Sequence, residues 1–206
     1  MSWEQQFMLK GLCLLTGYLL GGFLTAEIVA RCMAGVSIHY VGDGSPTARN
    51  LARHLGKPAA FAAVAGDVLK TVLVCWFCYR LAAPELEHAA VLYGGLGAVC
   101  GHARPLWRRA WGGGSVVVVC TWLVLYLPIT GALCCLAGLV VVAGTGHRAL
   151  GAVLIGALAV PVAWLQFGSS AGGAMALAAL LLVWEYRARL FHPGEGEEEM
   201  PLHRRW

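Results

Sequence analysis

Residues 115–143 read SVVVVCTWLVLYLPITGALCCLAGLVVVA, a run without a charged side chain. A helix that spans a membrane needs about 20 apolar residues, within a range of roughly 17–25. This run is too long for one such helix, and Pro128 lies inside it. Because proline removes a backbone donor and clashes with the preceding turn, it tends to break or kink a helix. We therefore predict two spans here, over residues 114–127 and 130–144.

Other apolar stretches extend this pattern along the chain. They cover residues 8–30, 59–82, 86–101, 148–167 and 172–190. The predicted fold is therefore an all-α membrane protein with seven transmembrane helices, forming one domain over residues 1–190 and followed by a charged tail over residues 191–206. Hydrophobic residues make up 59% of the chain and charged residues 13%, whereas a soluble domain carries about 25% charged residues. A soluble core could not bury this much apolar sequence, so lipid is the expected solvent.

The basic residues predict the orientation. If the N-terminus lies outside, only Lys10 and Arg80 fall in outside segments and Lys70 lies within a span. The remaining basic residues fall in the inside loops and the C-terminal tail: Arg31, Arg49, Arg53, Lys57, Arg104, Arg108, Arg109, Arg148, Arg187, Arg189, Arg204 and Arg205. Cytoplasmic loops of membrane proteins carry such an excess of Lys and Arg. We expect the N-terminus outside and the C-terminus in the cytoplasm.

The first cytoplasmic loop, residues 41–57, reads VGDGSPTARNLARHLGK. Backbone N–H groups of a glycine-rich loop can cradle an anion. Arg49 and Arg53 are four residues apart, so on a helix they share a face, and two guanidinium groups on one face can hold a phosphate. Ordinary anchoring to anionic lipid head groups explains the same residues equally simply.

The second cytoplasmic loop, residues 101–115, reads GHARPLWRRAWGGGS. Gly112, Gly113 and Gly114 directly precede the next predicted span, where free N–H groups would attract an anion. Trp107 and Trp111 suit the level of the lipid head groups, and a basic aromatic segment of this kind can also lie on the membrane surface. The residues alone leave both interpretations open.

Two charged residues lie within a predicted span. Asp67 and Lys70 are three residues apart, and charges inside a membrane are costly and are usually paired or functional. They can neutralise each other on one helix face, and Glu27 is a third charge near the end of the first span. Cys75 and Cys78 have C-x-x-C spacing but lie in mid-span without a second pair, so we expect no metal.

Both loops resemble the signatures of the bacterial PlsY family, the acyl-phosphate:glycerol-3-phosphate acyltransferases. The first loop is similar to G-S-G-N-P-G-A-T-N-V-x-R, the charged pair to a following D-x-x-K, and the second loop to G-H-x-x-P-x-F-x-x-F-x-G-G-K-G. The positions that match are Gly42, Gly44, Pro46, Ala48, Asn50, Arg53, Asp67, Lys70, Gly101, His102, Pro105, Gly112 and Gly113. The resemblance covers nearly the whole chain and implies a bundle of seven spans with its signature loops inside.

The resemblance also implies an activity. Proteins of this family transfer a fatty acyl group from acyl phosphate to glycerol 3-phosphate, giving lysophosphatidic acid for phospholipid synthesis. The catalytic candidates are His102, Asp43 and Asn50. The resemblance implies that Asn50 and Arg53 hold phosphate or glycerol and that His102 orders the second loop. The expected phosphate-binding residues are Gly42, Gly44, Ser45, Arg49, Arg53, Arg104, Gly112, Gly113 and Gly114.

The expected setting follows from the same resemblance. It is the inner (plasma) membrane of a bacterial cell, which the chain would cross several times. Acyl phosphate, glycerol 3-phosphate or a related precursor, and membrane lipid are the expected partners, together with a possible protein partner. No cofactor, metal or nucleic acid is expected.

The chain also departs from the family pattern, which keeps other hypotheses open. In the first loop the replacements are Asp43 for Ser, Ser45 for Asn, Thr47 for Gly and Arg49 for Thr. Gly114-Ser115 stands where the second signature has Lys-Gly, and the H-x-E-N of the last span appears as residues 183–186, VWEY, without its His and Asn. The alternatives to a divergent acyltransferase are a non-catalytic membrane module that binds lipid or a protein, and a small transporter that uses Asp67 and Lys70.

Overall fold

The computed structural model describes residues 2–106 and 112–191, and over these residues every regular element is helical. The elements are α1 (Trp3–Gly21), α2 (Thr25–Ala34), the short 3-10 helix η1 (Ile38–Tyr40), α3 (Ala48–His54), α4 (Lys57–Leu86), α5 (His88–Ala103), α6 (Val116–Tyr126), α7 (Pro128–Thr145), α8 (Arg148–Phe167) and α9 (Ser169–Phe191). The predicted all-α class is confirmed. The residues predicted at 107–111, among them Trp107, Arg108, Arg109 and Trp111, and those of the tail after 191 lie outside the described part of the chain.

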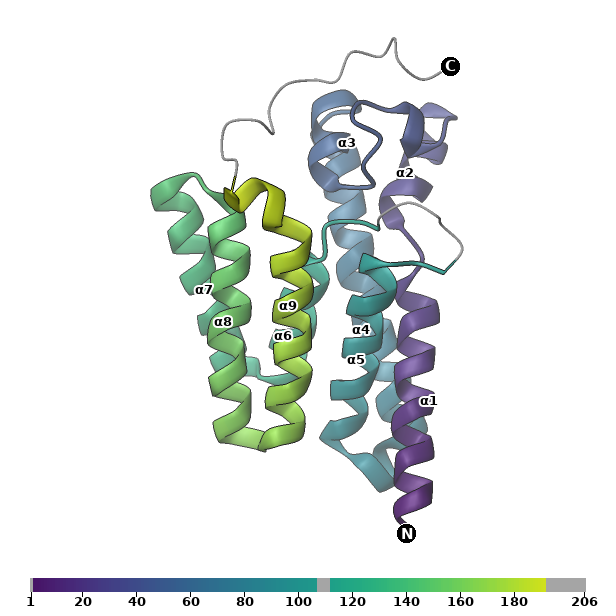
Figure 1. Ribbon diagram of the computed structural model, residues 1–206. Helices are drawn as coiled ribbons and strands as arrows, with labels where there is room; N and C mark the ends of the chain where they lie inside the picture. Colours follow the sequence, from purple (N-terminus) through teal and green to yellow (C-terminus); the bar gives the residue numbers. More distant parts are fainter. Residues whose placement is uncertain (1, 107–111, 192–206) are drawn as a thin grey trace.

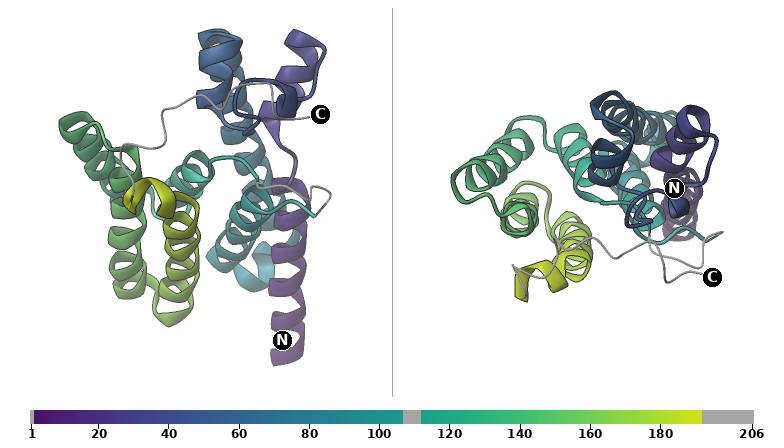
Figure 2. Two further views of the ribbon diagram at one scale, coloured as in Figure 1. Left: turned by 45° about the horizontal axis from the view of Figure 1, so that its top comes forward. Right: turned by 90° about the horizontal axis from the view of Figure 1, so that it is seen from above.

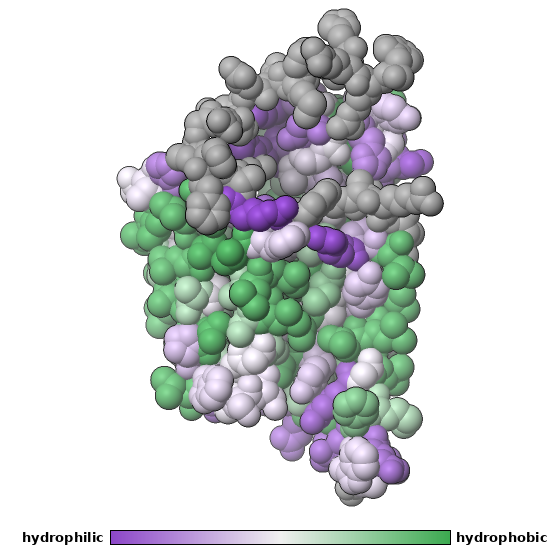
Figure 3. All heavy atoms as spheres, viewed as in Figure 1, coloured by the Kyte–Doolittle hydropathy of each residue, from purple (hydrophilic) through white to green (hydrophobic). Residues whose placement is uncertain are grey.

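Long apolar helices dominate the architecture. Within the described ranges, five segments are long and apolar enough to cross a membrane: Trp3–Ala34, Lys57–Ala82, α7, α8 and α9, with α6 as a shorter apolar helix. Leu139 and Leu165 are among the many large apolar residues exposed on the surface, and apolar side chains cover the middle of the face in Figure 3. A surface of this kind matches lipid, so the expected membrane protein is confirmed at this level.

The break at Pro128 lies where the sequence predicts it. α6 ends at Tyr126, and α7 begins with Pro128 at its first position, where the missing N–H of proline is not needed for the helix. Leu127 between them has φ −124° and ψ 76°. The prediction of two helices in this long apolar run is therefore confirmed.

The first predicted span is not one helix. We expected residues 8–30 to form a single span, but α1 ends at Gly21 and α2 begins only at Thr25. Lys70 Nζ donates to the Phe23 carbonyl oxygen at 2.8 Å, and Thr25 Oγ1 donates to Asp67 Oδ1 at 2.6 Å. Side chains of α4 thus pair groups at the break, which an apolar count along the sequence cannot reveal.

Small residues let α1 and α5 pack closely. α1 lies against α5 along much of its length, and an added Cβ at Gly17 would collide with the Gly94 carbonyl. Added Cβ atoms at Gly97 and Gly101 would likewise strike backbone atoms of α1. Gly17 and Gly21, which are four residues apart on α1, therefore mark a helix contact, as small residues commonly do in membranes.

Two hydrophobic clusters hold the helices together. The larger one is centred on Trp122, which is fully buried and donates from Nε1 to the Val91 carbonyl at 3.1 Å. The smaller one packs α2, η1, α3 and the start of α4 around Ile38 and Leu51. This second cluster lies at the end of the molecule opposite the N-terminus (Figures 1 and 2). It fixes the first loop, residues 41–57, to the bundle.

Candidate functional site

The first loop is folded by its own side chains. Asp43 Oδ1 accepts hydrogen bonds from the backbone N–H of Ser45 at 2.9 Å and from its hydroxyl at 2.6 Å. Thr47 caps α3 by accepting from the Asn50 N–H at 3.2 Å. Gly42 has φ +54°, a conformation that residues with a Cβ rarely adopt. Through its two hydrogen bonds from Ser45, the Asp43 carboxylate stabilises the turn of the loop.

Asn50 stabilises this loop through hydrogen bonds from its buried side chain. Its side chain is 3% exposed, and Nδ2 donates to the Val41 carbonyl at 2.8 Å and to the Ser45 carbonyl at 3.0 Å. Its Oδ1 atom is buried and has no hydrogen-bond partner among the described atoms. A side chain predicted to hold substrate thus also fixes the backbone shape of the loop.

Arg49 and Arg53 both lie on α3, so the four-residue spacing does place them on one helix face. Arg53 is exposed, and Arg49 is half-buried. Both are close in sequence to the buried Asn50 and to the turn that it organises. The guanidinium groups are therefore carried by a helix whose first turn is tied to the glycine loop.

Asp67, Lys70 and His102 form one buried cluster between α4 and α5. Lys70 Nζ lies 2.7 Å from Asp67 Oδ1 and 2.7 Å from His102 Nδ1. The predicted pairing of Asp67 and Lys70 is confirmed by the first of these distances. The link to His102, and the contact of Asp67 with Thr25, were not foreseen. Thr25 lies in an apolar run, and nothing in its neighbourhood in the sequence points to α4.

The second loop uses its N–H groups differently from the expectation. Gly112 donates to the Ala103 carbonyl at 3.0 Å, and Gly113 donates to the His102 carbonyl at 3.2 Å. These two donors therefore hold the loop to the end of α5, which corrects the prediction that they stand free for an anion. Ser115 N–H lies 3.1 Å from each carboxylate oxygen of Glu185 on α9, so a side chain already occupies the start of α6.

The two loops meet at one place. A Cβ added to Gly113 would lie 2.5 Å from His102 Nε2 and 2.9 Å from the Pro46 carbonyl oxygen. One added to Gly114 would lie 3.9 Å from Thr47 Cγ2 and 3.9 Å from the Tyr186 hydroxyl. Loops far apart in the sequence therefore share a junction, as a common binding site requires.

Buried polar atoms accompany this junction. Asn50 Oδ1, His102 Nε2 and Ser115 Oγ are all buried without a hydrogen-bond partner among the described atoms. Most buried polar groups in proteins are hydrogen-bonded, so each exception needs an explanation. All three belong to the two loops that the sequence singled out. Such atoms are suited to a polar ligand or ordered water between the loops.

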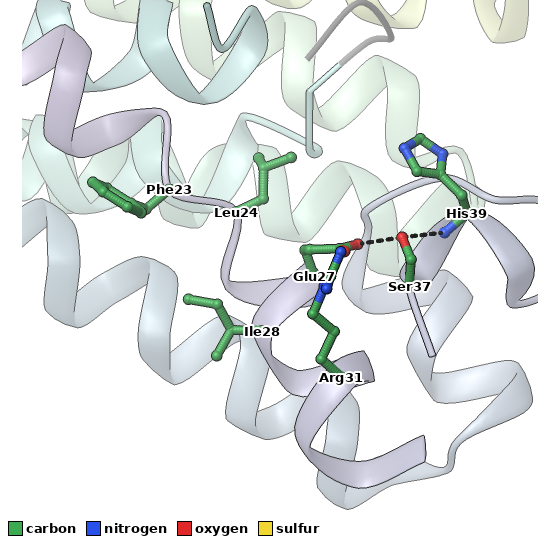
Figure 4. A pocket seen from close by; sticks show the side chains of 7 residues that line it. All are labelled: Phe23, Leu24, Glu27, Ile28, Arg31, Ser37 and His39. Carbon is green, nitrogen blue, oxygen red and sulfur yellow. Dashed lines mark hydrogen bonds and ion pairs between the residues drawn. The ribbon is translucent and has the colours of Figure 1, made fainter. Parts of the chain in front are cut away.

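A cavity of about 310 Å³ lies beside the break between α1 and α2 (Figure 4). It is lined by Phe23, Leu24, Glu27, Ile28, Arg31, Ser37 and His39. Glu27 accepts hydrogen bonds from Arg31 Nε at 2.6 Å and from the Ser37 hydroxyl at 3.1 Å. Because the Phe23 carbonyl is bonded to Lys70, one wall of this cavity is joined to the buried charged cluster.

Arg104 lies at the edge of the second loop. Its guanidinium carbon is 5.9 Å from the ring centroid of Trp184 on α9, and its carbonyl accepts from the Tyr18 hydroxyl at 2.7 Å. Arg187 also lies over the Trp184 ring, at 3.9 Å. The basic residue predicted for phosphate binding is thus placed against the last helix, next to Gly112 and Gly113 in a small cleft.

Comparisons with known proteins agree with this architecture. The sequence profile of a family described as glycerol-3-phosphate acyltransferase matches residues 11–192. A glycerol-3-phosphate acyltransferase of Prochlorococcus marinus (strain NATL2A) is 31% identical over 196 residues, which cover 91% of this chain and 96% of that protein. One of Cupriavidus pinatubonensis is 32% identical over 187 residues, covering 89% and 92%.

A crystal structure of PlsY, an integral membrane glycerol 3-phosphate acyltransferase in its glycerol 3-phosphate form, has a similar fold. The TM-score is 0.77 at 20% sequence identity, and the match covers 92% of this chain and 94% of that one. The form of the same protein with lysophosphatidic acid gives a TM-score of 0.75 at 18% identity, with the same coverage.

Proposed function

The chain belongs to the glycerol-3-phosphate acyltransferase family, and on this basis we propose that it moves a fatty acyl group from acyl phosphate to glycerol 3-phosphate in phospholipid synthesis. The observation that carries the proposal is the junction of the two glycine- and arginine-bearing loops. Gly113 lies between His102 Nε2 and the Pro46 carbonyl there, and buried polar atoms without partners accompany it.

The acyl group passes directly between the two substrates, so the protein does not need to form a covalent bond to either of them. The glycerol hydroxyl oxygen forms a bond to the acyl carbonyl carbon, the bond from that carbon to the phosphate oxygen breaks, and the hydroxyl proton leaves with the released phosphate. Both substrates are phosphate anions, so holding them together is the main problem. Positive groups fixed in a water-poor site lower the barrier, and correct placement of the two reactants adds to this effect.

We assign the anion-holding role first to Arg53 and Arg49 on α3, supported by Arg104 and by the backbone of Gly42 and Gly114. The Gly44 N–H already donates to the Val41 carbonyl at 3.0 Å. The exposed Arg53 side chain is suited to bind the phosphate of an incoming soluble substrate. His102 supplies a polar ring atom at the junction, and Asn50 holds the loop in shape through the Val41 and Ser45 carbonyls. Asp43 keeps the turn closed through Ser45.

The cavity beside the α1–α2 break is our candidate for the proximal part of the donor acyl chain. Phe23, Leu24 and Ile28 give it apolar walls, and Arg31 and His39 lie at its polar side. Ile28→Trp should fill it and slow turnover of long-chain acyl phosphate more than that of a short-chain one. Equal slowing for both chain lengths, or slowing by the surface variant Ile129→Trp on α7, would rule out this assignment.

The finer topology is also a proposal. Seven spans with the N-terminus outside would put both loops at the cytoplasmic face, where soluble glycerol 3-phosphate is available. Lys10 lies in the N-terminal half of α1 and Arg80 in the last two turns of α4, away from the loops, in agreement with an excess of positive charge on the loop side. The proposed location is a bacterial inner membrane.

A second candidate is a non-catalytic module with the same fold that binds lipid. It is favoured by one observation: Gly114 stands where the family signature has a lysine. The neighbouring Ser115 N–H donates to the Glu185 carboxylate, and no lysine at residue 114 is there to offset that negative charge close to the proposed phosphate site. The assay below separates the two candidates.

The test is an assay of purified full-length protein in detergent with acyl phosphate, acyl-coenzyme A or the acyl thioester of acyl carrier protein as donor. We expect phosphate release and lysophosphatidate formation in equal amounts with acyl phosphate and glycerol 3-phosphate. Loss of a charge-assisted contact to phosphate in Arg53→Ala should lower kcat/KM by about 10-fold or more, whereas Arg80→Ala should not change it. Activity that survives Arg53→Ala would remove the proposed clamp, and a folded but inactive wild-type protein would favour the non-catalytic module.

A further inference from the structure

The cluster of Asp67, Lys70 and His102 joins α4 to the start of the second loop. Lys70 Nζ lies 2.7 Å from Asp67 Oδ1, 2.7 Å from His102 Nδ1 and 2.8 Å from the Phe23 carbonyl oxygen. A lysine ammonium has three N–H donors and no acceptor. Each of its donors therefore faces one acceptor, and the ammonium group is fully used within the cluster.

This arrangement fixes the proton of the histidine ring. A ring nitrogen that accepts a hydrogen bond from an ammonium group cannot carry a proton, so His102 Nδ1 is the lone-pair nitrogen and Nε2 carries the hydrogen. A charged ring would put a second cation 2.7 Å from Lys70. Asp67 alone would then have to offset two buried cations, which is unfavourable.

The protonated nitrogen faces the place where the loops meet. His102 is 2% exposed, and Gly113 leaves no room for a side chain between Nε2 and the Pro46 carbonyl oxygen. The Gly114 backbone lies close to the ring as a weak acceptor, although Nε2 makes no hydrogen bond of good geometry with the described atoms. A donor with a fixed direction therefore points at the junction, where a substrate oxygen would compete only with this weak contact.

We propose that Lys70 is a positioning residue, which holds His102 in its Nε2–H tautomer so that the ring donates a hydrogen bond to a substrate oxygen at the junction of the two loops. Asp67 in turn orients Lys70, and Thr25 orients Asp67 through the 2.6 Å hydrogen bond to Oδ1. The identity of the acceptor as a substrate oxygen rests on the proposed function, whereas the tautomer does not.

The break between α1 and α2 contributes to the positioning of Lys70 and His102. The Phe23 carbonyl is one of the three acceptors of Lys70, and it lies between the two helices, where the chain is not helical. The break thus supplies the acceptor that leaves only one ammonium hydrogen for His102. The interrupted first span is therefore a functional element of the site.

The experiment is nitrogen-15 NMR of full-length protein with labelled histidine, in detergent and without substrate. The His102 resonances are identified by their loss in His102→Gln. We expect wild-type His102 to show one protonated and one lone-pair nitrogen, with the proton on Nε2. Asp67→Asn/Lys70→Met removes both charges and keeps the net charge, and it should give a mixture of tautomers. The same variant should lower kcat/KM by about 10–100-fold, the range known for loss of an orienting partner of histidine in metal sites.

Lys10→Met is the matched control, because it removes a lysine of α1 that lies away from the cluster. The Lys10 Nζ atom is 5.8 Å from the centroid of the Tyr93 ring. This variant should leave both the tautomer and the rate unchanged. A wild-type His102 with its proton on Nδ1, or with both nitrogens protonated, would overturn the proposal whether or not the double variant folds. A double variant that keeps a pure Nε2–H tautomer would also overturn it. If the tautomer shifts as expected and the wild-type protein makes no lysophosphatidate, the positioning role stands and the proposed function fails.

Discussion

At the scale of single residues, Asn50 and Arg53 make different contributions although they are only three positions apart. Asn50 is buried and pairs the Val41 and Ser45 carbonyls, whereas Arg53 is exposed. Each buried carbonyl left without a donor costs about 1–3 kcal/mol. Asn50→Ala should therefore lower both the thermal unfolding midpoint in detergent and the activity, while Arg53→Ala should lower activity alone. An Asn50→Ala protein as stable as the wild type would contradict the scaffolding role.

Gly113 offers a second test at this scale. A Cβ there would lie 2.5 Å from His102 Nε2 and 2.9 Å from the Pro46 carbonyl oxygen, so Gly113→Ala must push the two loops apart. We expect the acyltransferase rate to fall by about 100-fold or more, because misplacement of reacting groups by about 1 Å costs that much. Gly173→Ala on α9 is the control, since nothing lies within 4 Å of its added Cβ. Equal rates for the two variants would show that the contact of the loops is not needed.

Several residues of the site could be predicted from the sequence because their types carry local information. Glycines, Asn50 and the arginines of α3 stand together in one loop, and Asp67 and Lys70 are charges in an apolar run. The role of Thr25 and of the Phe23 carbonyl could not be predicted. Both depend on a contact between segments about 40 residues apart, and neither is unusual in its own neighbourhood. The pairing of the Gly112 and Gly113 N–H groups with the end of α5 could not be predicted either, because a run of glycines does not indicate which carbonyl groups its N–H groups meet.

At the scale of helices, the contact between α1 and α5 depends on missing side chains. An added Cβ at Gly17 would collide with the Gly94 carbonyl, whereas Gly11 on the same helix has nothing within 4 Å. Overpacking of a close contact costs about 1–3 kcal/mol. Gly17→Ala should therefore lower the unfolding midpoint in detergent, and Gly11→Ala should leave it unchanged or raise it slightly. An unchanged midpoint for Gly17→Ala would mean that α1 does not pack on α5 as described.

The sequence predicts helices best where composition and breakers agree. α8 covers the predicted residues, and Pro128 separates α6 from α7 as expected. A hydropathy profile does not predict the interruption after Gly21, because the residues on both sides of it are apolar. The break is stabilised by α4, through Lys70 and Asp67, and a window along one segment contains no information about its partner.

At the scale of the whole molecule, the proposed orientation makes a prediction about accessibility. Cys32 on α2 is the one cysteine of the eight that is exposed, and it lies on the same end as the two loops. A membrane-impermeant maleimide should label it in inverted membrane vesicles but not in intact spheroplasts. Cys32→Ser should abolish the labelling. Labelling in intact spheroplasts would place the loops outside and reverse the orientation.

The fold and the family match are retained over nearly the whole chain, whereas several individual signature residues have changed. Nearly the whole chain matches its relatives, from residue 11 to residue 192, although Gly114 and Tyr186 stand where the family signatures have Lys and Asn. The loops still meet, and their buried polar atoms still lack partners. We infer that the geometry of the anion site is kept while some of the residues that surround it have changed.

The most direct test of this account follows labelled glycerol 3-phosphate into lipid. Purified protein is placed in vesicles with acyl phosphate and labelled glycerol 3-phosphate, and the lipid fraction is analysed for lysophosphatidate. The account predicts that label enters lysophosphatidate in proportion to the amount of protein and that Gly113→Ala reduces it sharply. Folded wild-type protein that leaves all label in the water phase would contradict the account.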